Sequence, residues 1–201
     1  MTRLLCTLGL MTLLLLGSGC QVLDALSAPR PEVKITSARV GEVSAEGFDL
    51  NMNLAVSNLA DGRSLPVNRL PFDLALNGQN VLSATASLTG NVPAGESRDF
   101  SFDATVPWES VANVARTLEQ RDEFTSLDYT FAGRLELPEY DFVGIVPVSH
   151  EGTLDLREIL QKAIRNPSVF ADPGFQQLLR EATPVARDLI PLGTLNFPSQ
   201  L

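Results

Sequence analysis

Hydrophobic and polar residues alternate along most of the chain between Glu32 and Leu156. In the first clear run, apolar residues occupy every second position from Phe48 to Val56, and polar residues such as Asp49 lie between them. This period places apolar side chains on one face of a β-strand and polar side chains on the other. The pattern therefore predicts strands with one buried face.

Further segments repeat the alternation, and turn-forming residues separate them. Asn77-Gly78 tolerates positive φ and predicts a type I′ hairpin, and a loop is expected from Gly90 to Ser97. About seven strands with turns between them are typical of an antiparallel β-sandwich, so the predicted class is all-β. The further apolar runs are Leu70–Leu76, Leu82–Leu88, Phe100–Val106, Leu127–Leu135 and Val146–Leu156.

One interruption has helical spacing. Val111, Val114, Ala115 and Leu118 lie on one face of a helix that would follow Pro107 and span Trp108 to Gln120. This segment is predicted to be a short crossover helix between strands.

The spacing changes again after the last strand. Apolar residues from Leu156 to Ile164 fit one helix face, and Pro167 would end that helix. Asp172 and Pro173 are expected to be the N-cap and first turn of a second helix, whose apolar stripe is Phe175, Leu178, Leu179 and Ala182 and which Pro184 would bend or end. Three covers for these stripes are open: the sandwich itself, a partner protein, or a membrane.

The first residues are typical of a secretory leader. Arg3 precedes an apolar run from Leu4 to Leu16, which is too short to span a membrane, and the small residues Gly17, Ser18 and Gly19 follow it. Cys20 comes next. The segment resembles a bacterial lipobox, in which the cysteine thiol receives a diacylglycerol and becomes the mature N-terminus. Gly17 stands where the lipobox usually has leucine, and the alternative is ordinary secretion with cleavage near Ala28.

Four segments are therefore expected: a signal peptide at 1–19, a lipidated tether at 20–31, a β-sandwich at 32–156 and a helical extension at 157–201. Cys6 would be removed with the leader, which leaves Cys20 as the lipidation site and no disulfide in the mature chain. Acyl chains on Cys20 would make the membrane the expected partner. Gln21 in place of aspartate favours the outer membrane, with the domain in the periplasm.

The charge of the chain limits its other partners. The formal net charge is −9, and only Lys34 and Lys162 among the 15 basic residues are lysines. An acidic chain without a basic stripe is not expected to bind nucleic acid.

The strand segments resemble the late embryogenesis abundant type 2 family, also described as the water-stress and hypersensitive-response domain. The resemblance covers Glu32 to Leu156 and leaves out the two C-terminal helices. It implies an immunoglobulin- or fibronectin-like sandwich and a role in desiccation or envelope stress. This chain has Asn58-Leu59-Ala60 where the family often has Asn-Pro-Asn. The matching motifs are Phe48–Asn58, Leu65-Pro66-Val67, Phe72–Gly78, Val92-Pro93-Ala94-Gly95, Val106-Pro107 and Tyr129–Gly133.

Catalytic chemistry has few candidates. His150 is the only histidine, and its neighbour Ser149 would face the other way in a strand, so His150 is interpreted as a structural residue at a strand end or in a loop. We expect no catalytic, cofactor or metal site. Trp108 is expected to cap the core, and Phe48, Phe72, Phe100, Phe102 and Phe131 to pack inside it. The acidic clusters, expected to be solvated loops, are Glu119, Asp122 and Glu123, and Glu136, Glu139 and Asp141.

The sequence thus favours a non-catalytic, membrane-anchored stress protein of the cell envelope. One alternative is a carrier or scaffold that holds a lipid or partner between the sheets or under the C-terminal helices, which requires a cavity or an open groove. A second alternative is a hydrolase that uses His150.

Overall fold

A computed structural model describes residues 30–60, 62–118, 125–137 and 144–181. This part of the chain contains seven strands, three α-helices and one short 3₁₀ helix. The helices are α3 (Trp108–Leu118), α4 (Leu156–Ile164) and α5 (Pro173–Glu181), and the 3₁₀ helix is η1 (Pro167–Ala171). The strands are β1 (Glu32–Val43), β2 (Gly47–Ser57), β3 (Leu65–Leu76), β4 (Gln79–Val92), β5 (Ser97–Pro107), β6 (Ser126–Glu136) and β7 (Ile145–Asp155).

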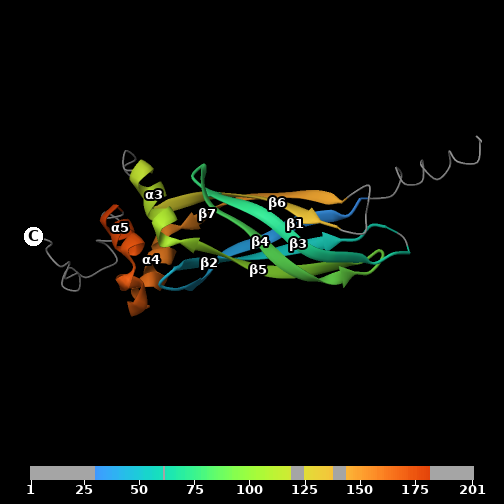
Figure 1. Cartoon of the computed structure of the whole chain (residues 1–201), viewed down its shortest axis with the longest axis horizontal. Helices are drawn as coiled ribbons and strands as arrows, with labels where there is room; N and C mark the ends of the chain where they lie inside the picture. The colour runs from blue at the N-terminus through green and yellow to red at the C-terminus, as the bar shows by residue number, and fades with distance from the viewer. Residues whose placement is uncertain (1–29, 61, 119–124, 138–143, 182–201) are drawn as a thin grey trace, which may run out of the picture.

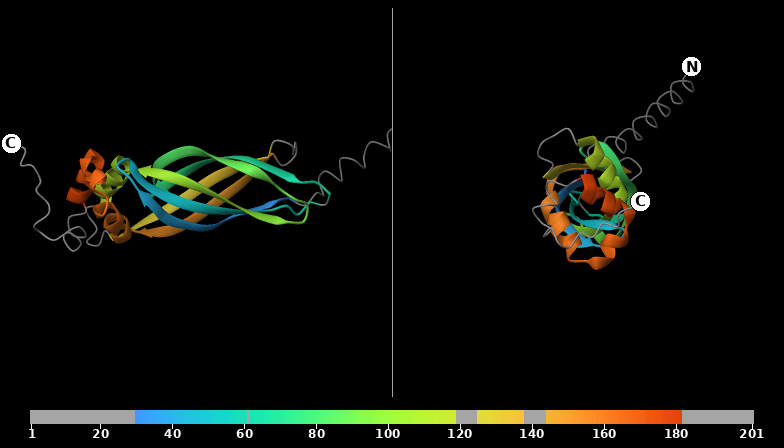
Figure 2. Two further views of the ribbon diagram at one scale, coloured as in Figure 1. Left: turned by 90° about the horizontal axis from the view of Figure 1, so that it is seen from below. Right: turned by 90° about the vertical axis from the view of Figure 1, so that its left-hand side faces the viewer.

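Two antiparallel sheets pack face to face. One has the strand order β1-β2-β5 and the other β4-β3-β6-β7, and α3 carries the chain from the first sheet to the second. β4 lies beside β5 and β1 beside β7, so the sheet edges meet and the end-on view in Figure 2 is almost a closed ring. The expected all-β sandwich, with one crossover helix and two C-terminal helices, is confirmed.

The core is formed by the apolar side chains that occupy alternate positions of the strands. Every second residue of β2, from Phe48 to Val56, is fully buried. Phe72, Phe102 and Phe131 come from three strands of the two sheets, and their ring centroids lie 5.2 to 6.0 Å apart. The five phenylalanines expected in the core are all buried, so packing accounts for them.

The sandwich is elongated, and its two ends differ (Figure 1). At one end, which we call the helical end, α3, α4, η1 and α5 close the core. At the other, which we call the loop end, the chain enters β1, and turns join β2 to β3 and β4 to β5.

Trp108 lies at the centre of the helical end. Its side chain is 1% exposed, and its ring lies 5.9 Å from that of Phe48 in the sandwich and 4.9 Å from that of Phe175 on α5. The indole N–H donates to the carbonyl oxygen of Ser44 at 3.0 Å. Trp108 therefore caps the core, as the sequence predicts, and receives α5 on its outer side.

The C-terminal helices pack on the protein itself. α5 contacts α3, and α4 contacts β1 and β6, so the sandwich end and α3 cover the two apolar stripes. Lys162 Nζ donates to the carbonyl oxygen of Val40 at 2.6 Å, and Asn166 Nδ2 to that of Val43 at 2.8 Å. The sequence left three possible covers for these helices: the sandwich itself, a partner protein or a membrane. The structure shows the first of them. Ala182 and Pro184 lie outside the described residues.

The helix boundaries follow capping chemistry. Asp155 Oδ1 accepts from the Arg157 N–H at 2.8 Å, and Asp172 Oδ1 accepts from the Phe175 N–H at 2.9 Å. The expected N-cap at Asp172 is confirmed. The 3₁₀ helix η1 was not expected from the sequence; its N-cap is Asn166, and Pro167 occupies its first turn.

Two asparagines fix the turns that join the strands. Asn77 has φ 47° and Gly78 has φ 81°, as a type I′ hairpin requires, so this turn is confirmed. Asn58 is the one buried polar residue among the described residues. Its Oδ1 accepts from the Ala60 N–H at 3.2 Å, and its Nδ2 donates to the carbonyl oxygens of Arg63 and Val92 at 2.7 and 3.0 Å. The turn thus forms without the proline that the family resembled by the sequence often has there.

Candidate functional surfaces

Ser149 and His150 lie on opposite faces of β7. His150 pairs with Phe131, and its ring lies 5.9 Å from that of Tyr129, whereas Ser149 pairs with Ala132 and is exposed. The prediction that His150 lies at a strand end or in a loop is wrong, because it lies in the middle of β7. Burial raises the pKa of the Tyr129 phenol above its ordinary value, so this neighbour stays neutral at physiological pH. The geometry does not assemble a serine–histidine pair.

Of the residues in the two acidic clusters, the structure describes only Glu136, and the prediction that it lies in a solvated loop is wrong because it is part of a strand. Glu136 lies on β6, where it pairs with Arg69 on β3 and Ile145 on β7. No group of three or more His, Cys, Asp or Glu residues that could hold a metal ion occurs among the described residues. Glu119, Asp122, Glu123, Glu139 and Asp141 lie outside the described residues.

Cys20, the expected lipidation site, also lies outside the described residues, so its modification stays a prediction. Among the residues that are described, no helix has the length and apolar character needed to cross a bilayer.

A band of short polar side chains covers the outer face of β2 and β5, and we call it the polar face. Its members hydrogen-bond across the strands: Thr105 to Asp49 at 2.7 Å, Ser101 to Asn53 at 2.6 Å, and Asn51 to Asp103. The members are Asp49, Asn51, Asn53, Ser57, Ser97, Ser101, Asp103 and Thr105.

The polar face continues onto the other sheet. β4 lies beside β5, and five consecutive outward positions of β4 carry exposed hydroxyl or amide side chains. These short side chains present hydrogen-bond donors and acceptors to solvent at the regular spacing of neighbouring strands. Such a surface can bind water through these groups. The five residues are Ser83, Thr85, Ser87, Thr89 and Asn91.

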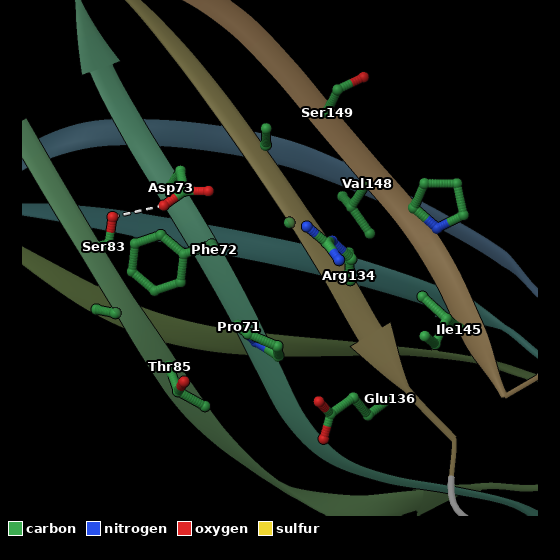
Figure 3. A pocket seen from close by; sticks show the side chains of 14 residues that line it. Pro71, Phe72, Asp73, Ser83, Thr85, Arg134, Glu136, Ile145, Val148 and Ser149 are labelled. Atoms are coloured by element: carbon green, nitrogen blue, oxygen red, sulfur yellow. Dashed lines mark hydrogen bonds between the residues drawn. The ribbon is translucent and has the colours of Figure 1, made fainter. Parts of the chain in front are cut away.

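A shallow hollow of about 990 Å³ lies on the outer face of the four-stranded sheet (Figure 3). Pro71 lies on one side of it, and Arg134 pairs across β6 and β7 with Pro147. The ladder between β3 and β6 has pairs at Arg69 and Phe72 but none at Pro71, which has no N–H to donate. Proline in a central strand thus coincides with the hollow.

The chemistry of the hollow is mixed. Arg134 is accompanied by two carboxylates, Glu136 and Asp73, and Asp73 accepts from the Ser83 hydroxyl at 2.5 Å (Figure 3). This hollow is on the outside, whereas the carrier hypothesis expects a space between the sheets or under the helices.

Sequence reasoning missed both surfaces because it followed the buried positions of each strand. The outward residues from Ser83 to Asn91 are visible in the sequence as an unbroken series of Ser, Thr and Asn. No comparable signal marks the hollow, which depends on register between four strands.

Solved structures of other proteins are similar to this chain. The solution structure of an Arabidopsis thaliana protein is 20% identical with a TM-score of 0.51, and the match covers 65% of this chain and 84% of that one. A crystal structure from Archaeoglobus fulgidus is 13% identical with a TM-score of 0.49, over 64% and 97% of the two chains. A third structure, of a protein assigned to the late embryogenesis abundant family, is 20% identical with a TM-score of 0.48, over 75% and 85%.

At these identities the Arabidopsis structure supports the fold alone. No curated protein matches this chain. The family model described as late embryogenesis abundant protein matches residues 53–152, from within β2 to within β7. That segment of the sandwich is therefore similar to the late embryogenesis abundant family.

Proposed function

We propose that this chain is a lipid-anchored protein of the bacterial cell envelope, attached through Cys20, and that its sandwich protects against desiccation or envelope stress without catalysis. The family match supports a water-stress role, and the leader ending at Cys20 supports the anchor. We place it at the outer membrane, facing the periplasm, and within the water-stress and hypersensitive-response group of the family.

The observation that carries the protective role is the polar face. Its carboxylate, amide and hydroxyl groups bond to one another and leave further lone pairs and hydrogens for water. The net charge of −9 adds to this hydration and opposes self-association. The domain would act as a hydrated spacer that shields neighbouring envelope surfaces when water is lost.

The test is survival of a deletion strain after drying, salt and detergent stress, with complementation by matched variants. Thr89→Val with Thr105→Val removes two hydroxyls from the surface of β4 and β5, and Thr130→Val with Thr153→Val removes two from β6 and β7. We expect the deletion to lower survival, the first pair to restore it incompletely, and the second to restore it fully. Equal survival of the deletion and parent strains would rule the protective role out.

The hollow favours a second candidate, a scaffold that holds a lipid or a partner on the outer face of the four-stranded sheet. Arg134, with Pro71 and Pro147 on either side, supplies a cation between apolar rings. If this function holds, a ligand that co-purifies with the native protein is lost in Arg134→Ala and retained in Thr130→Ala, which changes the same sheet face outside the hollow. Mass spectrometry of both preparations shows whether the ligand is present in each.

A further inference from the structure

The exposed large hydrophobic side chains both lie toward the loop end of the sandwich, at different levels. Among the described residues these are Leu59, which is 51% exposed, and Ile145, which is 59% exposed. Leu59 follows the end of β2 and lies on a turn of the loop end. Ile145 begins β7 and is set back from the turns, because it pairs with Glu136, which pairs with Arg69 inside β3; its side chain lines the hollow. The helical end buries its large apolar residues, including Trp108, Phe175 and Leu179.

Leu59 is held on a fixed turn. The preceding residue, Asn58, binds with its backbone as well as its side chain: its N–H donates to the Glu96 carbonyl at 2.8 Å, and its carbonyl accepts from the Gly95 N–H at 2.9 Å. With the three side-chain bonds of Asn58, these lock the turn that carries Leu59. A side chain presented from a fixed backbone loses little conformational entropy when it is buried in an interface.

The chain also enters the domain at the loop end. Arg30 is exposed there, just before β1, and the ten residues from Cys20 to Pro29 span at most about 35 Å when extended. A lipid on Cys20 would therefore keep the loop end near the bilayer. The helical end is farther away by the length of strands such as β2, 11 residues or about 36 Å.

The charges of the loop end fit a headgroup layer. Arg63 is exposed on the same turn as Leu59, and Glu96 is exposed on the neighbouring turn. Cations near apolar side chains are typical of proteins that rest in the membrane interface, where the apolar groups enter the acyl boundary. Charges of both signs suit zwitterionic lipids better than a strongly anionic surface.

We propose that the loop end is a lipid-contacting surface: Leu59 enters the interfacial layer of the bilayer, and Arg30 and Arg63 lie at the level of the lipid phosphates. The domain then stands end-on, with the helical end directed away from the membrane. This inference rests on the proposed anchoring through Cys20.

The experiment measures the depth of single labels in the full-length, processed protein. Cys6 leaves with the leader and the Cys20 sulfur is blocked by lipid, so Leu59→Cys and Ile145→Cys each introduce the only free thiol. Each is labelled with an environment-sensitive fluorophore and placed in phosphatidylethanolamine and phosphatidylcholine vesicles that contain nitroxide-labelled lipid. The matched control is Gln161→Cys, an exposed residue of α4 at the helical end.

We expect nitroxide lipids to remove most of the fluorescence at residue 59, less at residue 145 and none at residue 161. Protein that floats with the vesicles but is unquenched at residue 59 overturns the contact and leaves the anchor intact. Equal quenching at all three positions overturns the end-on orientation. Protein that does not float with the vesicles overturns both the anchor and the contact.

Discussion

The two ends of the sandwich are closed by different physical means. At the helical end, Trp108 joins Phe48 to Phe175, and large apolar surfaces are removed from water. At the loop end, the amide of Asn58 satisfies two carbonyl groups and one N–H, and Leu59 beside it stays exposed. Packing closes one end of this fold, and a buried hydrogen-bonding group organises the other.

At the loop end, therefore, the residue that stabilises the turn differs from the residue that is exposed on the surface. Because Asn58 fixes the turn through polar contacts, the exposed side chain of Leu59 beside it is not needed to hold the turn. The side chains of the helical end are more constrained, because its aromatic rings pack tightly against one another and a change in one ring disturbs its neighbours.

The largest effect is expected at the helical end. Trp108→Ala removes the ring between the sandwich and α5, leaves a cavity, and should lower the free energy of unfolding by about 3–5 kcal/mol. Chemical denaturation followed by circular dichroism measures this. Leu59→Ala is the matched control, and a loss of less than 1 kcal/mol in Trp108→Ala would show that packing does not hold this end.

The next effect lies at the loop end. Asn58→Ala leaves the carbonyl groups of Arg63 and Val92, the second of them buried, without the amide donor, and should cost about 2–4 kcal/mol. The control is Asn91→Ala, an exposed asparagine at the same end. If both variants unfold at the same denaturant concentration, the comparison between the two ends fails.

A smaller effect is expected at the start of α5. Asp172→Ala removes the N-cap acceptor of the Phe175 N–H and should cost about 1 kcal/mol. Asp99→Ala, an exposed aspartate of β5, provides the control. Hydrogen exchange of the α5 amides should increase in the first variant and not in the second, and unchanged exchange would contradict the capping role.

The smallest effect on stability is expected at Leu59. Leu59→Ser should change the free energy of unfolding by no more than about 0.5 kcal/mol, because the side chain is already half in water. Leu65→Ser, at the fully buried first residue of β3, should cost about 2–5 kcal/mol. A large loss in Leu59→Ser would mean that this leucine serves the fold and not a surface.

Much of the fold could be predicted because burial has a period. The alternation from Phe48 to Val56 places β2 and its buried face, and Asn77-Gly78 requires a turn with positive φ. The N-cap at Asp172 is equally local. Such features depend on a few residues that are neighbours in the sequence, so a short stretch of the chain is enough to predict them.

Features that depend on tertiary contacts could not be predicted. The 3₁₀ helix η1 forms where Asn166 also binds β1. The hollow near Pro71 requires the register of four strands. The exposure of Leu59 follows from the Asn58 contacts, which join residues up to 38 positions apart.

The central claim of a membrane-anchored sandwich is tested most directly by the intact mass of the protein extracted from membranes. We expect a chain that begins at Cys20 and carries a diacylglycerol, and we expect Cys20→Ser to leave the membrane fraction. A mature chain that begins at another residue, or an unmodified Cys20, would contradict the account.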